Sequence, residues 1–373
     1  GPGPTITQGL FSLVSTNSER LVSIKIIFYK RIWNKENKIM KKKIDLVILA
    51  GGKGSRLKGL TRNTPKPLLK INKISFLQYL INYYSKYDFE KIYILAGYKG
   101  SKIKRQFHNK IFNLIPIECF IEKKKMDTAG ALYILKNKIN NNFVLINGDS
   151  FFDYDIKNII KSSLNSKIGQ MLLIKNFSYK SNSKLSKLGI NNQSEVFFKK
   201  NHFLMNSGVY FFKKKFLNLI KNEPRSLETD ILPKLISNRK ISGVYASGYF
   251  IDIGTKKNLD IAKKEFKNRF LKPAIFLDRD GVLIEDMHYL KDPNQVFLIE
   301  GALELLREAK KRGLITIVIS NQSGVGRGYY NWNDYEAVTM KMLSLFGESE
   351  LISAMYASGA QPETDIEIYR KWR

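Results

Sequence analysis

The feature that most constrains the fold is a regular alternation of short apolar runs with longer amphipathic stretches. It begins with IDLVILA at residue 44 and continues through FLQYLINYYSKY, KIYILAG, KIKRQFHNKI and FVLING. Short apolar runs bounded by turn residues indicate buried strands, and amphipathic stretches indicate the helices that cover them. Such alternation favours βαβ units, whose strands run parallel in one sheet. The sequence therefore predicts an α/β protein with a mainly parallel sheet.

A second series of the same kind lies nearer the end of the chain. PAIFLDRDG indicates a strand, ALELLREAKKRG a helix closed by Gly313, and LITIVIS the next strand. A length of 373 residues allows about two to three domains. We therefore expect a first domain over residues 40–271 and a second, smaller α/β domain over residues 272–373.

The segment of residues 1–39 shows neither a convincing strand and turn pattern nor the order of a signal peptide. Met40 stands directly before the first predicted strand. We therefore expect translation to start at Met40, and residues 1–39 to be a non-native or disordered extension.

The charge is divided unevenly between the two predicted domains. The whole chain carries 63 Lys and Arg against 33 Asp and Glu, but residues 272–373 carry 12 against 15, which leaves 51 against 18 for residues 1–271. The lysines of the first part are scattered among Ile, Asn, Phe and Tyr, without an arginine-rich stripe. This pattern favours phosphorylated small molecules over nucleic acid as partners.

The cysteine and hydropathy patterns narrow the class further. Cys119 is the only cysteine, which excludes a disulfide framework within the chain and fits a reducing compartment. No apolar run approaches the roughly 20 residues that a membrane-spanning helix needs. We therefore expect a soluble, cytoplasmic protein that does not bind a membrane, with homo-oligomers left open.

The first group of candidate functional residues follows the strand that ends at Ala50. The glycine-rich turn GGKGSRL lets backbone N–H groups approach phosphates without a Cβ in the way, and it matches neither a P-loop nor a dinucleotide-binding fingerprint. Arg56 supplies a planar cation, and Lys66 between two prolines supplies another. Asp149 and Asp252 each end a predicted strand, and such a pair suits Mg²⁺ that bridges nucleotide phosphates.

The motifs GGKGSRL, TPKPLL, DTAGAL, NGDS, NSGVY and DIGT, in this order, resemble the sugar-1-phosphate nucleotidyltransferase family over nearly all of residues 44–265. The resemblance implies a Rossmann-like nucleotidyltransferase fold and a reaction in which an NTP and a sugar 1-phosphate give an NDP-sugar and pyrophosphate. By this likeness Arg56 and Lys66 hold the triphosphate as catalytic residues, and Asp149 and Asp252 bind Mg²⁺. It also implies that the nucleotide contacts Leu49, Ala50, Gly51, Gly52, Gly54, Ser55, Asp127, Thr128 and Gly130.

For the sugar phosphate, the resemblance implies contacts with Glu122, Lys200, Asn206 and Glu228. Many members of the family carry a Glu-Lys pair in an FxEK pattern. Here the corresponding stretch is FFKK, which ends at Lys200 and lacks the glutamate.

The second group of candidate functional residues follows the strand within PAIFLDRDG. Asp278 and Asp280 lie just beyond this strand, where one carboxylate can attack phosphorus and the other can move protons. Ser320 ends the next strand and can donate its hydroxyl to a phosphoryl oxygen, and Asn321 and Arg327 follow it in SNQSGVGRG.

DRDGVLIED, YLKDPNQVFLIEG and SNQSGVGRG resemble the haloacid dehalogenase phosphatases, most closely the branch of heptose 1,7-bisphosphate and histidinol phosphatases. By this likeness Asp278 is the nucleophile, Asp280 is the acid/base, and both lie at a Mg²⁺ site. The resemblance also assigns Asn321 to the phosphate and Arg327 to the neighbourhood of the substrate. The family also uses a later lysine and a later aspartate. The sequence ends at Arg373 before they occur, so we expect an incomplete and inactive or nearly inactive phosphatase unit.

A fused transferase and sugar bisphosphate phosphatase suggest consecutive steps of GDP-heptose synthesis for lipopolysaccharide or another surface polysaccharide. The phosphatase would act on D-glycero-D-manno-heptose 1,7-bisphosphate, and the transferase would then use GTP and the heptose 1-phosphate. Mannose or glucose 1-phosphate is the nearest alternative acceptor. A non-catalytic nucleotide-binding regulatory module and a basic nucleic-acid-binding protein remain alternatives of other classes.

Overall fold

The computed structural model describes residues 44–87, 89–112, 115–162, 167–175, 185, 187–198, 204–270, 273–348, 351–365 and 370. The chain forms two compact units, and the division falls between Lys267 and Asn268. The predicted extension of residues 1–39 lies outside the described residues. Each unit is described below by itself.

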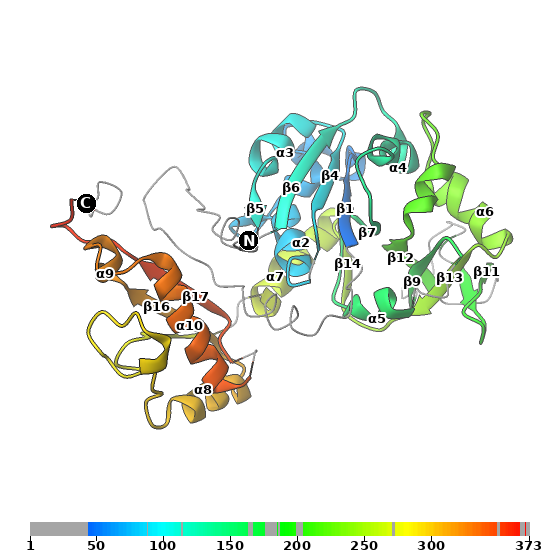
Figure 1. The fold of residues 1–373 in the computed structure, drawn as a ribbon. Coiled ribbons are helices and arrows are strands. Elements are labelled where there is room, and N and C mark those ends of the chain that lie inside the picture. The colour runs from blue at the N-terminus through cyan, green and yellow to red at the C-terminus, as the bar shows by residue number, and fades with distance from the viewer. Residues whose placement is uncertain are drawn as a thin grey trace, which may run out of the picture. The chain divides into compact units, whose positions relative to one another are not determined.

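The centre of the first unit is a set of four parallel strands. They are β1 (Ile44–Ala50), β4 (Ile92–Ala96), β6 (Ile115–Ile121) and β7 (Asn142–Asn147), in the order β6-β4-β1-β7. Figure 1 shows these strands side by side. Six of the seven residues of β1 are buried, as expected for a continuous apolar run in a parallel sheet. The α/β fold predicted from the alternating pattern is therefore confirmed for this unit.

The strand order of this sheet reverses at β1. The next parallel strands along the chain, β4 and β6, lie on one side of β1, and β7 lies on the other. In open α/β sheets, ligands bind at the carboxyl ends of the strands where the order reverses. The residues that follow β1 and β7 are therefore the ones that this topology places at a binding crevice.

The sheet continues beyond β7 through antiparallel pairs that the alternating pattern did not predict. β12 (Leu204–Phe212) pairs antiparallel with β7 and with β9 (Gly169–Lys175), and β13 (Ile241–Tyr245) pairs parallel with β9. The sheet is thus parallel at its centre and mixed at its margin. Its shorter strands are β5 (Ile111–Phe112), β10 (Leu188–Ile190) and β11 (Val196–Phe198).

A separate antiparallel ribbon joins β8 (Ser150–Phe152) to β14 (Phe250–Asp252). Phe151 of this ribbon packs edge-to-face against Phe266 of α7 (Lys256–Phe270), with ring centroids 5.3 Å apart. Two rings of α2 (Phe76–Tyr84) also pack on Phe266. This aromatic cluster fixes the ribbon to two helices of the first unit.

The other helices and turns of the first unit connect these strands. The helix α3 (Gly100–Phe107) packs against β4 and β6. The remaining elements are η1 (Ser55–Thr61), η2 (Lys66–Leu68), β2 (Lys70–Ile71), β3 (Ile74–Ser75), α4 (Asp127–Gly130), η3 (Ala131–Leu135), α5 (Lys157–Ser162), η6 (Lys214–Leu219), η7 (Leu227–Ile231) and α6 (Leu232–Ser237).

The second unit is built on three parallel strands, in the order β15 (Ala274–Leu277), β16 (Ile315–Asn321) and β17 (Ala354–Ser358). The predicted helix is α8 (Ala302–Lys311). It ends just before Gly313, whose φ is 71°. The other helical elements are η8 (Pro293–Gln295), α9 (Ser323–Gly326) and α10 (Trp332–Phe346).

The core of the second unit lies on one face of its sheet, where Val318 and Met355 pack with buried residues of α8 and α10. On the opposite face Phe276 is 62% exposed and Ile319 is 51% exposed. Among the described residues of the chain, no helix is both long enough and apolar enough to cross a membrane.

Candidate functional site

The glycine-rich turn after β1 is held in place by its own backbone and by neighbouring elements. Gly54 adopts a φ of 65°, and its carbonyl accepts hydrogen bonds from the Leu57 N–H at 2.9 Å and the Thr61 hydroxyl at 3.1 Å. A Cβ at Gly54 would lie 3.1 Å from the Cβ of Lys66. Glycine is therefore required by both the left-handed backbone and the close packing. The turn thus lies directly against the stem of Lys66.

Lys66 lies between the two predicted metal-binding aspartates. Its Nζ is 2.6 Å from Oδ2 of Asp149 and 3.2 Å from Oδ1 of Asp252. The side chain of Lys66 is 5% exposed, whereas those of Asp149 and Asp252 are 38% and 41% exposed. The amine is therefore buried beneath two carboxylates that remain open to solvent.

The β8–β14 ribbon explains how carboxylates so distant in sequence meet. Asp252 pairs with Ser150, the residue after Asp149, and the Ile253 N–H donates to the Asp149 carbonyl at 3.0 Å. Asp252 thus belongs to this ribbon and not to the main sheet, whereas Asp149 directly follows β7 of the main sheet.

Arg56 joins the same group of charges. A Cβ at Gly254 would lie 2.8 Å from Oδ1 of Asp252, 3.1 Å from Nζ of Lys66 and 3.4 Å from Nη2 of Arg56. The structure therefore brings together the arginine, the lysine and the aspartates that the sequence singled out. Sequence reasoning did not single out Gly254 itself, although it lies within the DIGT motif.

Glu122 lies beside Gly51, at the start of the glycine-rich turn. Its carboxylate accepts a hydrogen bond from the Met126 N–H at 3.0 Å, and a Cβ at Gly51 would lie 2.7 Å from its Oε1. Burial raises the pKa of the Glu122 carboxyl above its usual range. The structure thus places Glu122 beside the turn predicted to bind the nucleotide, although the resemblance assigns it to the sugar.

The short helix α4 is fixed to the segment that precedes η7. The Ala129 and Gly130 N–H groups donate to the Arg225 carbonyl at 2.9 and 3.2 Å. The Thr128 hydroxyl donates to Oε2 of Glu228 at 2.7 Å. Asp127 is exposed, with a φ of 54°, and pairs with Lys125. Thr128 of the predicted nucleotide site and Glu228 of the predicted sugar site are therefore in direct contact.

Asn206 belongs to the same neighbourhood through Tyr210. The Asn206 side-chain amide donates to the Tyr210 hydroxyl at 2.5 Å. Burial raises the pKa of Tyr210 well above its usual range, and the nearby Glu228 raises it further. Asn206 and Glu228 thus lie around one buried tyrosine that the sequence analysis did not single out. Lys200, the remaining predicted sugar-phosphate residue, lies outside the described residues.

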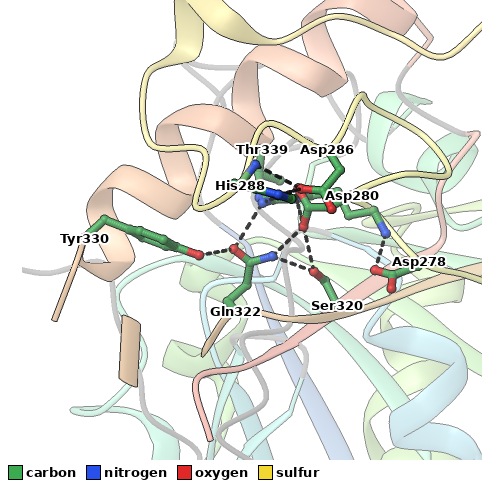
Figure 2. Close-up of polar contacts among 9 residues, drawn as sticks. Asp278, Asp280, Asp286, His288, Ser320, Gln322, Tyr330 and Thr339 are labelled. Atoms are coloured by element: carbon green, nitrogen blue, oxygen red, sulfur yellow. Dashed lines mark hydrogen bonds and ion pairs between the residues drawn. The ribbon is translucent and has the colours of Figure 1, made fainter. Parts of the chain in front are cut away.

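Three of the predicted phosphatase residues, Asp278, Asp280 and Ser320, form a second cluster at the carboxyl ends of β15 and β16. Figure 2 shows this cluster. The buried Arg279 guanidinium donates from Nε to both oxygens of Asp280, each at 3.1 Å, and from Nη2 to Oδ1 at 2.8 Å. The Arg279 backbone N–H donates to Asp278 at 2.6 Å. Arg279 thus lies between the two predicted catalytic aspartates and holds one of them.

Ser320 near the end of β16 and Gln322 just after it complete the polar environment of Asp280. The Ser320 hydroxyl and the Gln322 amide donate to its Oδ2 at 3.2 and 2.6 Å (Figure 2). Ser320 is buried, and no hydrogen bond or ion pair within the described part of the chain joins Asn321 or Arg327 to either aspartate. Sequence reasoning did not single out Arg279, although it stands between the two aspartates in the DRD motif.

In the first unit, the residues that could hold a metal ion are the pair of carboxylates Asp149 and Asp252. Among the described residues there is no group of three or more His, Cys, Asp and Glu side chains placed to hold one. Asp149 and Asp252 both contact one amine, so their oxygens already converge on one position. One or two protein carboxylates suffice for Mg²⁺ when substrate phosphates supply the other ligands.

The first unit has the sequence of a known enzyme family. Residues 46–269 match the model of the family described as nucleotidyl transferase. The match covers more than half of the chain, so the chain belongs to the nucleotidyl transferase family.

Two named relatives each match more than half of the chain. The chain is 31% identical over 216 residues to the D-glycero-alpha-D-manno-heptose 1-phosphate guanylyltransferase of Campylobacter jejuni, which covers 57% of this chain and 95% of the relative. It is 31% identical over 262 residues to the bifunctional protein GlmU of Methanococcus aeolicus, which covers 63% of this chain. The match spans only 60% of that GlmU.

A solved structure supports the fold. HddC from Yersinia pseudotuberculosis, complexed with GMP-PN, is similar with a TM-score of 0.51 and 28% identity. The similarity covers 60% of this chain and all of HddC.

Proposed function

We propose that the first unit transfers a nucleotidyl group from an NTP to a sugar 1-phosphate and releases pyrophosphate. The observation that carries this proposal is the convergence of Arg56, Lys66, Asp149 and Asp252 around one position beside the glycine-rich turn. Attack of a sugar phosphate oxygen on the α-phosphorus brings two anions together. Catalysis therefore depends on positioning and on neutralising charge, which fixed cations at a half-buried site supply.

In this proposal Lys66 lies nearest the α-phosphate, and Arg56 binds the other phosphates. The base and ribose lie against the end of β1 and the glycine-rich turn, and α4 closes over the base. The acceptor sugar lies near Asn206, which hydrogen-bonds to the buried Tyr210, and near Glu228, whose charge raises the pKa of Tyr210. The contact between Thr128 and Glu228 joins the two halves of the site, so that nucleotide and acceptor can be bound side by side.

Asp149 and Asp252 would hold Mg²⁺. Bound there, the ion would neutralise phosphate charge and help to orient the triphosphate. The chain's own part is to present two solvent-open carboxylates, Asp149 after β7 and Asp252 from the ribbon, at the switch point of the sheet.

GTP and D-glycero-D-manno-heptose 1-phosphate are the favoured substrates. Support for the base and the sugar comes from the printed names of the heptose 1-phosphate guanylyltransferase relatives and from the GMP-PN complex of HddC. Mannose or glucose 1-phosphate is the alternative acceptor.

A matrix of five NTPs against heptose, mannose and glucose 1-phosphates, scored by pyrophosphate release, tests the proposal. We expect release with GTP and the heptose phosphate, its loss in EDTA, and a fall of at least about 100-fold in Asp149→Asn. The exposed Asp260→Asn on α7 is the matched control and should match the wild type. Tight nucleotide binding without any turnover would instead identify a regulatory module.

The second unit is proposed as part of a sugar bisphosphate phosphatase that acts before the transferase. Its supporting observation is the placement of Asp278 and Asp280 at the carboxyl end of β15, beside Ser320 at the end of β16. The test is phosphate release from D-glycero-D-manno-heptose 1,7-bisphosphate, compared with Asp278→Asn. Phosphate release that Asp278→Asn leaves unchanged would contradict the proposal.

A further inference from the structure

The amine of Lys66 occupies the position where the two candidate metal ligands converge. Its Nζ lies 2.6 Å from Asp149 and 3.2 Å from Asp252, and so it makes two charge-assisted hydrogen bonds. Mg²⁺ needs carboxylate oxygens at about 2.0–2.1 Å. A metal ion bound by both carboxylates would therefore stand almost where the ammonium group stands.

The ammonium group and a divalent ion cannot share this position, because two cations so close repel each other strongly. The stem of Lys66 has little freedom to give way. It is flanked by Pro65 and Pro67, and it packs on Gly54, where a Cβ would lie 3.1 Å from the Cβ and 3.4 Å from the Cδ of Lys66. Only the end of the side chain can move, and it needs another anion to move toward.

The triphosphate of the nucleotide is such an anion, since the glycine-rich turn that is proposed to bind it lies directly against the Lys66 stem. We infer that Lys66 acts as an internal cation that keeps the Asp149–Asp252 pair closed to divalent ions until a nucleotide binds. The nucleotide phosphates then draw the amine away and free both carboxylates. Divalent ion and nucleotide thus bind in a coupled manner, and free metal binds weakly.

This inference rests on the proposed function, and nucleotide-free Mn²⁺ binding tests it. Mn²⁺ titrations followed by electron paramagnetic resonance report the free ion without any turnover. We expect Lys66→Gln, which removes the charge, to bind Mn²⁺ about tenfold or more tightly than the wild type. Lys66→Arg, which keeps the charge, should bind weakly. Lys53→Gln removes one charge from the exposed part of the same turn and should match the wild type.

The outcomes separate this inference from the proposed function. If wild type and Lys66→Gln bind Mn²⁺ equally and Asp149→Asn abolishes binding in both, Lys66 does not close the site, and the metal pair stands. If Asp149→Asn leaves the Mn²⁺ affinity of Lys66→Gln unchanged, the metal pair itself is wrong.

Lys66→Gln leaves two neighbouring carboxylates without the lysine that pairs with them. A second measurement therefore avoids this substitution and uses the wild-type protein alone. A crystal structure with Mn²⁺ and a non-hydrolysable GTP analogue should show the Lys66 amine out of hydrogen-bond reach of Asp149 and Asp252. An amine that still bridges both carboxylates beside bound Mn²⁺ would overturn the inference.

Discussion

Asp45 is a buried acid at the start of β1, at the opposite end of the strand from the glycine-rich turn. Burial raises the pKa of its carboxyl to about 6, although the Asn141 amide donates to it at 3.2 Å and lowers the pKa in part. The folded state therefore favours the neutral acid. The neutral Asp45 carboxyl therefore contributes fully to stability at pH values below its unfolded pKa of about 4. This contribution is lost as the pH rises through its folded pKa of about 6.

We predict that Asp45→Asn stabilises the protein near neutral pH, because an amide carries no charge to bury. The free energy of unfolding should rise by about 1–2 kcal/mol at pH 7.5, less than the full value of a two-unit pKa shift because the new amide needs its own partners. Urea unfolding at pH 7.5 and pH 4 measures this. An equal difference between variant and wild type at both pH values would contradict the prediction.

Arg279 is a fully buried cation whose main charge partner is its sequence neighbour Asp280. It also donates to Thr339 and Gln322, and its guanidinium lies 4.7 Å from the centre of the Tyr335 ring. We predict that Arg279→Met destabilises the second unit by about 3–5 kcal/mol, because it leaves a carboxylate without its partner. Hydrogen exchange of α10 and β16 measures this loss.

The matched control for Arg279 is Arg307→Met, which breaks an exposed pair with Glu348 and should cost less than about 1 kcal/mol. In addition, Arg279→Met combined with Asp280→Leu should recover part of the lost stability, because both charges are then absent. A double variant as unstable as the single one would show that the lost stability came from packing.

At the level of single elements, the β8–β14 ribbon couples the site to the hydrophobic core through Phe266 of α7. We predict that Phe266→Ala lowers the free energy of unfolding by about 3–5 kcal/mol, since it empties a position that packs on rings of α2 and β8. It should also lower pyrophosphate release about tenfold or more while the protein is folded, because Asp252 is paired to β8. Ile261→Ala, at a 37% exposed position of the same helix, is the control and should change neither quantity.

The elements that the sequence revealed are those with a local signal. The buried strands β1, β4 and β7 and the helices between them follow from apolar runs and amphipathic spacing. The margin of the sheet formed by β9, β12 and β13 was not predicted, because its strand pairs join segments that are far apart in the chain. No local pattern specifies such partners, which are selected by packing in the folded protein.

The site was predictable to a similar degree. The sequence brought Arg56, Lys66, Asp149 and Asp252 together, since each follows or flanks a recognisable turn. It did not reveal that the lysine lies between the two carboxylates, which depends on the register that pairs Asp252 with Ser150. Arg279 and Tyr210 were missed for another reason, because buried polar partners leave no periodic pattern.

For the molecule as a whole, charge is divided unevenly along the sequence. Positions 1–271, which include the proposed transferase, hold 51 basic and 18 acidic residues, whereas positions 272–373 hold 12 and 15. Such an excess of positive charge attracts the anionic triphosphate from a distance. Added salt weakens this attraction, because the Debye length is about 10 Å at 0.1 M ionic strength and becomes shorter as salt is added.

We predict that the KM for the NTP rises several-fold between 50 and 300 mM NaCl while kcat changes little, because long-range attraction governs encounter and the buried Lys66 contacts govern the chemical step. Steady-state pyrophosphate release measures both constants. A nucleic-acid-binding protein would instead bind duplex DNA with a steep salt dependence that Asp149→Asn leaves unchanged. A KM independent of salt, together with such duplex binding, would assign the positive charge to nucleic acid and contradict its role in attracting the nucleotide.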